Sequence, residues 1–221
     1  MPSSYKKARL PGDPRSARRD NRRAELLESA RAAIRREGRA ASMEAIAREA
    51  GITKPIIYKH FGDRSGLAAA LAVEFVDGLL NELTQALRRE APPREILRTT
   101  VDAYLAFVER DPQIYRFLIR EAQPSSTAAG ETLSSVIREI GRQVAVLLGE
   151  QLRTAGLDSG PAEPWAFGIV GMVHLAGDWW VERPTMSRAR LVDYLTALLW
   201  DGMAGWSTTH QVTGPADALV E

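Results

Sequence analysis

The sequence lacks several patterns, and each absence excludes a class of protein. None of the 221 residues is cysteine, which excludes disulfide bonds, thiolate metal sites and cysteine nucleophiles. Valine, isoleucine and threonine form no alternating runs of the kind that β-strands show. No apolar run approaches the roughly 20 residues that a membrane helix needs, and the N-terminus has no apolar stretch typical of a secretory signal. We therefore expect a cytoplasmic protein that does not enter a membrane.

The common motifs of cofactor and catalytic sites are also missing. The sequence contains no GxGxxG, GxxxxGK[ST], GxSxG or HExxH pattern. An enzyme built on His174 and Asp178 would lack a nucleophile and a second acid–base pair. We therefore expect neither an enzyme nor a bound cofactor.

Helical periodicity is what the sequence has in abundance. Ala, Leu, Arg and Glu dominate, and apolar residues recur at three- and four-residue spacing. Gly and Pro fall between the periodic segments, where helices end and begin. The pattern predicts an all-α protein of about nine helices, near residues 20–37, 42–50, 53–61, 63–89, 95–108, 111–120, 131–154, 162–181 and 187–206.

Charge is distributed unevenly although the net charge is only +1. Residues 1–64 contain 16 basic and 8 acidic side chains, whereas residues 65–221 contain 13 basic and 20 acidic ones. A basic end on an otherwise acidic chain is typical of a protein that meets a polyanion through that end.

Residues 42–67, SMEAIAREAGITKPIIYKHFGDRSGL, contain the most informative pattern. Ser42 and Thr53 are placed to cap two short helices, and Gly51 lies at the turn between them. Asp63 then caps a new, long helix. This is the layout of a helix-turn-helix, whose second helix enters the major groove of DNA.

The segment GITKPIIYKHF resembles the DNA-binding end of the tetracycline-repressor (TetR) family. The resemblance covers roughly the first quarter to third of the chain and implies a three-helix DNA-binding domain followed by a helical domain for ligand binding and dimerisation. We accordingly expect four regions: a disordered basic tail, the helix-turn-helix domain, the effector and dimerisation domain, and a flexible tail, over residues 1–19, 20–64, 65–207 and 208–221.

The resemblance also implies which side chains meet double-stranded DNA. Exposed positions near the start of the second helix reach base edges, and flanking positions reach phosphates. The matching residues are Ser42, Thr53, Lys54, Pro55, Tyr58, Lys59 and Arg64. Two of them have alternative roles: Ser42 as a helix cap and Arg64 as a solvated first-turn residue.

Three features near this motif have more than one interpretation. Ile56 could contact a thymine methyl group or pack against the start of the following helix. His60 beside Phe61 is interpreted as part of the small core rather than as a catalytic base. The basic side chains of residues 6–23 either enter the minor groove or add non-specific attraction to phosphates, and we favour the second.

The last two predicted helices carry more apolar surface than one domain can bury. Residues 162–181 are apolar nearly all round, and residues 187–206 add a second apolar helix. The simplest solution is a homodimer in which these helices form a four-helix bundle, as the resemblance also implies. Such a dimer would place two recognition helices about 34–36 Å apart to bind a palindromic operator.

The resemblance further implies a pocket for a small-molecule effector among the fifth to eighth helices. An apolar, aromatic lining would suit a hydrophobic or amphipathic molecule; the alternative is that these residues are ordinary core. The candidate lining residues are Tyr104, Val108, Tyr115, Leu118, Val144, His174, Asp178 and Trp179.

His174, Asp178 and Glu182 share one helix face, a spacing that can bind a metal ion. The set is incomplete for a metal site, so we predict a His–Asp hydrogen bond and no metal. The favoured hypothesis is a ligand-responsive repressor that its effector releases from DNA. A helical ligand-binding protein without specific DNA recognition is the alternative, and activation is also compatible with the sequence.

Overall fold

The computed structural model describes residues 14–122 and 128–207, and these residues are helical with no β-strand. The prediction of an all-α fold is confirmed. None of the described helices is long and apolar enough to cross a membrane. The helices are α1 (Pro14–Glu37), α2 (Met43–Glu49), α3 (Lys54–Phe61), α4 (Arg64–Leu87), α5 (Pro93–Arg110), α6 (Pro112–Glu121), α7 (Ala128–Thr154), α8 (Ala162–Glu182) and α9 (Arg188–Ser207), with a 3-10 turn over Gly38–Ala40.

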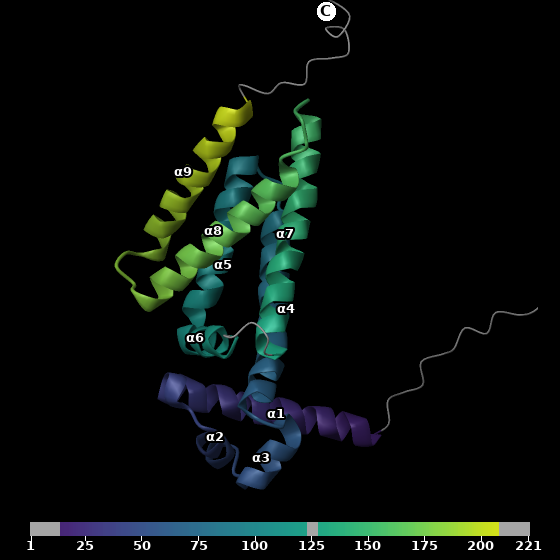
Figure 1. Ribbon diagram of the computed structural model, residues 1–221, viewed down its shortest axis with the longest axis vertical. Helices are drawn as coiled ribbons and strands as arrows, with labels where there is room; N and C mark the ends of the chain where they lie inside the picture. Colours follow the sequence, from purple (N-terminus) through teal and green to yellow (C-terminus); the bar gives the residue numbers. More distant parts are fainter. Residues whose placement is uncertain (1–13, 123–127, 208–221) are drawn as a thin grey trace, which may run out of the picture.

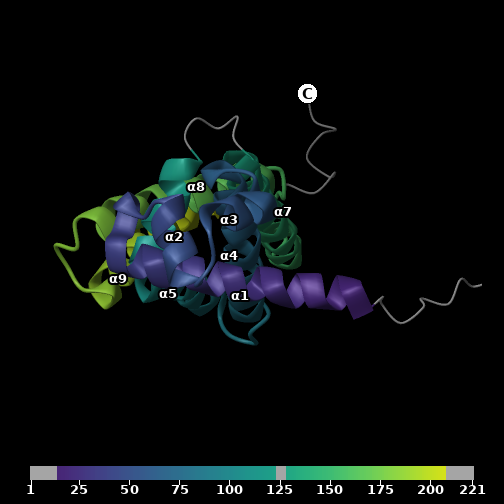
Figure 2. The same cartoon turned by 90° about the horizontal axis from the view of Figure 1, so that it is seen from below.

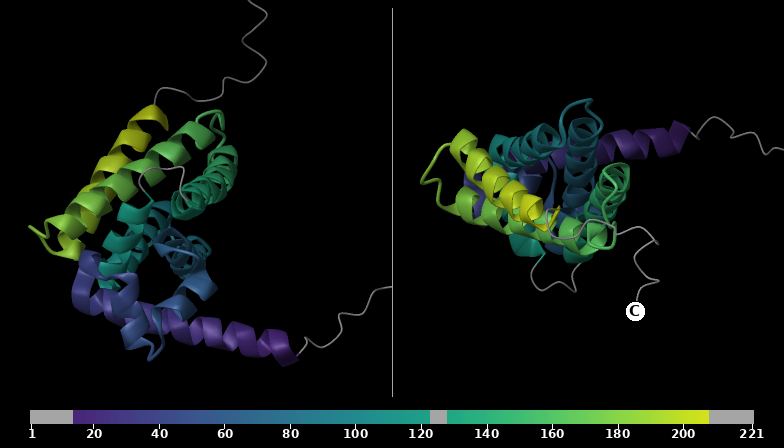
Figure 3. Two further views of the ribbon diagram at one scale, coloured as in Figure 1. Left: turned by 60° about the horizontal axis from the view of Figure 1, so that its bottom comes forward. Right: turned by 90° about the horizontal axis from the view of Figure 1, so that it is seen from above.

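The helices form a small unit at one end and a larger body above it (Figure 1). Helices α1, α2 and α3 make up the small unit, and α4 rises from it into the body. Seen from below, α1 crosses the end of the body and its N-terminal half projects beyond it (Figure 2). In the body, α7 packs on α4 and α8, and α5 packs on α4 and α9. Helices α8 and α9 lie along one outer side of the body (Figure 3).

Two hydrophobic cores hold these parts together. The first contains buried residues of α1, α2 and α3, the first turns of α4, and Ile114, Phe117 and Leu118 of α6. The second joins α4, α5, α8 and α9 with Tyr115 of α6. Phe75 packs against both cores. Helices α4 and α6 therefore belong to both units.

The start of α1 differs from the prediction. The helix includes Pro14 to Arg19, a segment that the sequence predicts to be part of a disordered tail. Proline is tolerated in a first helical turn because its missing N–H would have no partner there, and the Ala and Arg that follow favour helix. The rest of that tail, the predicted tail 208–221 and residues 123–127 of the predicted 121–130 loop lie outside the described residues. The ends of that loop differ from the prediction, because Glu121 belongs to α6 and residues 128–130 form the start of α7.

Glycines shape the connection between α3 and α4. Gly62 has φ +77°, a conformation that L side chains rarely adopt, and it ends α3. Asp63 then caps α4 by accepting a 2.8 Å hydrogen bond from the backbone N–H of Gly66. A Cβ on Gly66 would lie 2.0 Å from the carbonyl oxygen of Phe61, so no larger residue fits.

We therefore expect Gly66→Ala to destabilise the protein by about 1–3 kcal/mol, the usual cost of overpacking. Thermal unfolding followed by circular dichroism would measure it. Gly149→Ala is the matched control, because the nearest atoms to a Cβ there would be the flexible end of the Arg153 side chain at 3.2 Å and the Ala162 Cβ at 3.5 Å, and helical alanine gains about 0.5–1 kcal/mol over glycine. Equal melting temperatures for the two variants would contradict this account.

Candidate nucleic-acid interface and ligand cavity

Helix α3 presents one polar face to solvent. Ile57 and Phe61 are buried in the first core, which fixes the rotation of the helix. The opposite face exposes the predicted DNA-contacting residues Thr53, Lys54, Pro55, Tyr58 and Lys59. Thr53 occupies the N-cap position, but its side chain makes no capping bond. The hydroxyl is therefore not used by the helix, contrary to the predicted cap.

Two charged side chains are paired on this face. Lys54 hydrogen-bonds Glu44 of α2, and its ammonium lies 5.6 Å from the centre of the Tyr58 ring. The bond to Lys54 lowers the pKa of the Glu44 carboxyl. Both side chains are about half exposed, so solvent screens the pair and weakens it. A phosphate could therefore compete with Glu44 for Lys54.

Ser42 and Arg64 serve the protein itself. Ser42 caps α2 by accepting a 3.1 Å hydrogen bond from Ala45 N–H. Arg64 bonds Glu121 of α6 at 2.8 Å and the Ala41 carbonyl, and its guanidinium lies 4.7 Å from the centre of the Phe117 ring. The interpretation of Arg64 as a solvated first-turn residue is therefore wrong, because it joins α4 to α6.

Ile56 and His60, two further residues of α3, differ in their exposure to solvent. Ile56 is 41% exposed, on the solvent side of α3. His60 is half-buried, and its backbone carbonyl accepts a 2.9 Å hydrogen bond from Arg23. The Arg23 guanidinium also lies 4.7 Å from the centre of the Phe61 ring, so it fastens α1 to the end of α3.

A cavity of about 480 Å³ lies in the body, lined by α4 to α8 and by Trp200 of α9. Its wall is mostly aliphatic and aromatic. Five of the eight predicted lining residues reach it: Tyr104, Tyr115, Val144, His174 and Asp178.

The other three predicted lining residues do not line the cavity. Val108 and Leu118 are fully buried in the two cores. Trp179 is 44% exposed and absent from the wall, because one residue beyond Asp178 is a turn of about 100° around the helix. The contribution of α4 to the cavity wall was not predicted, although its apolar residues follow helical spacing: Phe75, Val76, Leu79 and Leu83.

A polar cluster interrupts the apolar wall. The hydroxyl of Tyr104 lies 3.1 Å from that of Tyr115 and 3.0 Å from His174 Nδ1. Tyr115 donates a hydrogen bond to Asp178 Oδ1. His174 Nε2 lies 3.8 Å from Asp178 Oδ2, which is too long for the predicted direct hydrogen bond. The two tyrosines connect the pair instead.

Burial controls the protonation of both phenols. It raises the pKa of Tyr104 and of Tyr115 above the ordinary value, and the Asp178 charge raises both further. Both hydroxyls therefore carry their protons at neutral pH.

Glu182 does not join His174 and Asp178 in a metal-binding group, since the described part of the chain contains no group of three His, Cys, Asp or Glu side chains that could hold a metal ion.

Comparison with known proteins shows to which family a chain with these features belongs. Residues 82–216 match the family described as "Tetracyclin repressor-like, C-terminal domain", and residues 26–71 match "Bacterial regulatory proteins, tetR family". The chain belongs to the TetR family of transcriptional regulators. The second match runs from the middle of α1 to the first turns of α4, and the first match runs from the last turns of α4 through the rest of the body.

Relatives agree with this assignment. An uncharacterised HTH-type transcriptional regulator of Mycobacterium tuberculosis is 37% identical over 185 residues, which cover 83% of this chain and 78% of the relative. The HTH-type transcriptional activator FasR of Mycolicibacterium smegmatis is 29% identical over 189 residues, 84% of each chain.

Solved structures share the fold. A TetR-like transcriptional regulator from Rhodococcus sp. RHA1 has a TM-score of 0.64 at 27% identity, over 89% of this chain and all of the other. The fatty acid degradation regulator FadR from Bacillus halodurans has a TM-score of 0.66 at 18% identity, over 81% of this chain and 98% of the other.

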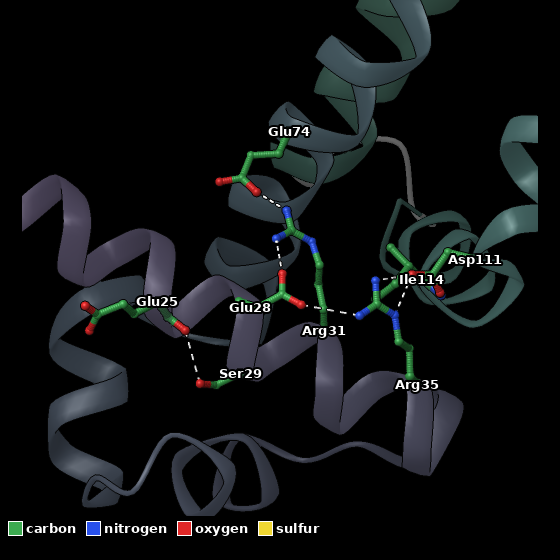
Figure 4. A network of polar contacts seen from close by, with 8 residues as sticks. All are labelled: Glu25, Glu28, Ser29, Arg31, Arg35, Glu74, Asp111 and Ile114. Carbon is green, nitrogen blue, oxygen red and sulfur yellow. Dashed lines mark hydrogen bonds and ion pairs between the residues drawn. The ribbon is translucent and has the colours of Figure 1, made fainter. Parts of the chain in front are cut away.

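In this TetR-family chain, ion pairs attach α1 to the body (Figure 4). Arg31 bonds Glu74 of α4, and Arg35 bonds Asp111 at 2.8 Å where α6 begins. Glu28 lies between the two arginines and bonds both. Asp111 also caps α6 through Ile114 N–H. Two of the helices that line the cavity, α4 and α6, are therefore also the helices to which α1 is attached.

The tyrosine bridge predicts the effect of a small substitution. Tyr115→Phe removes the hydroxyl that donates to Asp178, so we expect a loss of about 1–3 kcal/mol of unfolding free energy. Urea denaturation at fixed protein concentration would measure the loss. Tyr58→Phe is the control, because that ring is 37% exposed on the solvent side of α3 and surface changes stay within about 0.5 kcal/mol. An equally small effect at Tyr115 would contradict the bridge.

Proposed function

We propose that the chain is a dimeric, ligand-responsive transcriptional regulator that binds a palindromic operator through α3 and is released when a hydrophobic effector occupies the cavity. The observation that carries this proposal is the path of α4. Its first turns contribute Leu67 and Leu71 to the core of the α1–α3 unit. Its middle contributes Phe75, Leu79 and Leu83 to the cavity wall.

Helix α6 supports the same proposal. Its residues Tyr115 and Ile119 line the cavity, while Phe117 and Leu118 pack in the first core. Arg64 and the Arg35–Asp111 pair add polar links between the two units. A ligand that moves α4 or α6 would thus move α1 and α3. A typical coupling free energy of about 1–3 kcal/mol changes operator affinity by roughly 5–150-fold.

Exposed apolar side chains support dimerisation through α8 and α9. On α8, Met172, Leu175 and Trp179 recur at helical spacing and are 40%, 68% and 44% exposed. On α9, Tyr194 and Leu198 are 52% and 61% exposed. Burying these side chains against a second copy would remove them from water. The two-fold axis would also present two copies of α3 to one DNA duplex.

The exposed face of α3 supports the proposed DNA contacts. Lys54, Pro55 and Tyr58 occupy its first turns, from which side chains reach base edges. Thr53 and Lys59 are exposed on the same face, and we propose that they meet phosphates on either side. Ser42 and Arg64 would act indirectly, by capping α2 and by fixing the start of α4.

A second candidate is transcriptional activation by the same DNA-binding and ligand-binding parts. One observation favours it: the relative FasR, 29% identical over 84% of each chain, is named an activator. Reporter expression from the target promoter, with and without the intact gene, separates the two candidates. Expression that rises on deletion of the gene indicates repression, and expression that falls indicates activation.

The experiment that tests the proposal is fluorescence-anisotropy binding to the DNA upstream of the protein's own gene, with a scrambled duplex as comparison. We expect tighter binding to the native duplex that survives an increase in salt. Equal binding to both duplexes that salt abolishes would mean phosphate attraction alone. If selection from random DNA then also yields no preferred sequence, the helical binder without specific DNA recognition replaces the proposal.

The same assay tests Lys59. We expect Lys59→Ala to weaken binding to native and scrambled duplexes alike, and to lower the slope of log affinity against log salt by about one for each lost phosphate contact. Arg89→Ala is the control, an exposed cation just beyond the far end of α4. Identical slopes for the two variants would remove Lys59 from the interface.

The dimer is tested by adding a charge to its proposed surface. Leu198→Glu would place an unpaired carboxylate in the interface, at a cost of about 3–5 kcal/mol, which exceeds a hundredfold in the dissociation constant. We expect monomers by sedimentation velocity at concentrations where the unmodified chain is dimeric. Val146→Glu is the control, since this side chain is 60% exposed on α7. A dimeric Leu198→Glu variant would place the interface elsewhere.

A further inference from the structure

The polar cluster of the cavity has a definite hydrogen-bond direction. Tyr115 has one proton, and it goes to Asp178 Oδ1. The contact between the two phenols therefore requires Tyr104 to donate to Tyr115. Tyr104 then has no proton left, so its contact with His174 requires His174 Nδ1–H to donate. The chain runs from His174 through Tyr104 and Tyr115 to Asp178.

This direction determines what the cluster offers to a ligand. With its proton on Nδ1, a neutral His174 has a lone pair on Nε2. That nitrogen lies 3.8 Å from Asp178 Oδ2. Both atoms are acceptors, and both residues line the cavity. The cluster therefore presents two neighbouring acceptors and no spare hydroxyl proton.

The charged side chains of the cavity wall also favour a cationic ligand over an anionic one. Among the described residues that line the cavity, Asp178 is the only acid, His174 is the only residue with a basic side chain, and none is Lys or Arg. The surrounding wall is apolar, and a low dielectric strengthens the attraction of the carboxylate for a cation. A ligand carboxylate would instead face Asp178 without an arginine or lysine to neutralise it.

Packing makes this arrangement rigid. Gly177 lies between His174 and Asp178 on α8, and a Cβ there would come within 2.8 Å of the Tyr104 ring. The absent side chain lets Tyr104 lie against α8, where its hydroxyl reaches His174. Tyr104 and Tyr115 are both buried. The two acceptors are thus held in place before a ligand arrives.

We infer that the cavity takes an amphiphilic amine: an apolar chain or ring system against the wall, with a protonated, N–H-bearing head group donating to Asp178 Oδ2 and His174 Nε2. This inference specifies the effector of the proposed function and rests on the cavity being its ligand site. One ammonium group can donate to two acceptors at this separation, because it has three protons in a compact group.

The test compares head groups on one chain. Decylamine, decanol, decanoate and decyltrimethylammonium are titrated into the full-length protein without DNA, below their micellar concentrations, by isothermal titration calorimetry. We expect decylamine, which is protonated at neutral pH, to bind tightest. Its advantage over decanoate should be at least about tenfold, the usual scale for hydrogen bonds to charged groups. Decyltrimethylammonium, which has the charge but no N–H, should bind more weakly than decylamine.

Substitutions assign the preference to the cluster. Asp178→Asn should remove at least about tenfold of the affinity for decylamine and little of that for decanol. Asp158→Asn is the matched control, an exposed acid outside the cavity that loses the same charge. His174→Phe removes the second acceptor and should also weaken decylamine binding. If either cavity variant does not fold, the head-group order in the unmodified protein still decides.

Two results would overturn the inference. The first is decanoate binding as tightly as decylamine. The second is a decylamine preference that survives Asp178→Asn. Because this titration contains no DNA, it stands apart from the proposed function. Decylamine that binds as expected but leaves operator affinity unchanged would support the ligand chemistry and contradict release by that ligand.

Discussion

The packing of α4 and α6 in two cores at once is the constraint on which the rest of the structure depends. Leu67 of α4 and Leu118 of α6 are fully buried in the core of the α1–α3 unit, while Leu79 of α4 and Tyr115 of α6 pack in the core of the body. Close-packed cores do not deform continuously, so these helices cannot shift in one unit without repacking in the other. This shared packing gives the proposed effector a physical route to the operator.

Polar contacts reinforce that packing at three places. Arg31 fastens α1 to α4, Arg35 fastens it to the start of α6, and Arg64 joins α4 to the end of α6. The pairs of Arg31 and Arg35 are partly solvent-accessible, and pairs screened by solvent contribute little stability each. Their value lies in setting the position of α1 relative to the cavity helices (Figure 4).

The cavity in the body shows how much of a site local sequence patterns predict. Tyr104, Tyr115, Val144, His174 and Asp178 were predicted to line it, and they do. Val108 and Leu118 have the same apolar character but face buried cores. The contribution of α4 was missed, because its apolar stripe looks the same whether it faces a core or a cavity. An apolar stripe indicates that one face of a helix is buried, but it does not show whether a packed core or a cavity lies against that face.

The sequence by itself determined the helical class, most helix ends and the exposed face of α3. These follow from interactions between residues a few positions apart: the caps at Ser42 and Asp63, the left-handed glycine at Gly62, and the spacing of Ile57 and Phe61. Only the tertiary structure decided the link from Arg64 to Glu121 and the chain from His174 through two tyrosines to Asp178. The residues in those contacts are 11 to 70 positions apart. Their distances are set by how whole helices pack, and helical periodicity carries no information about that.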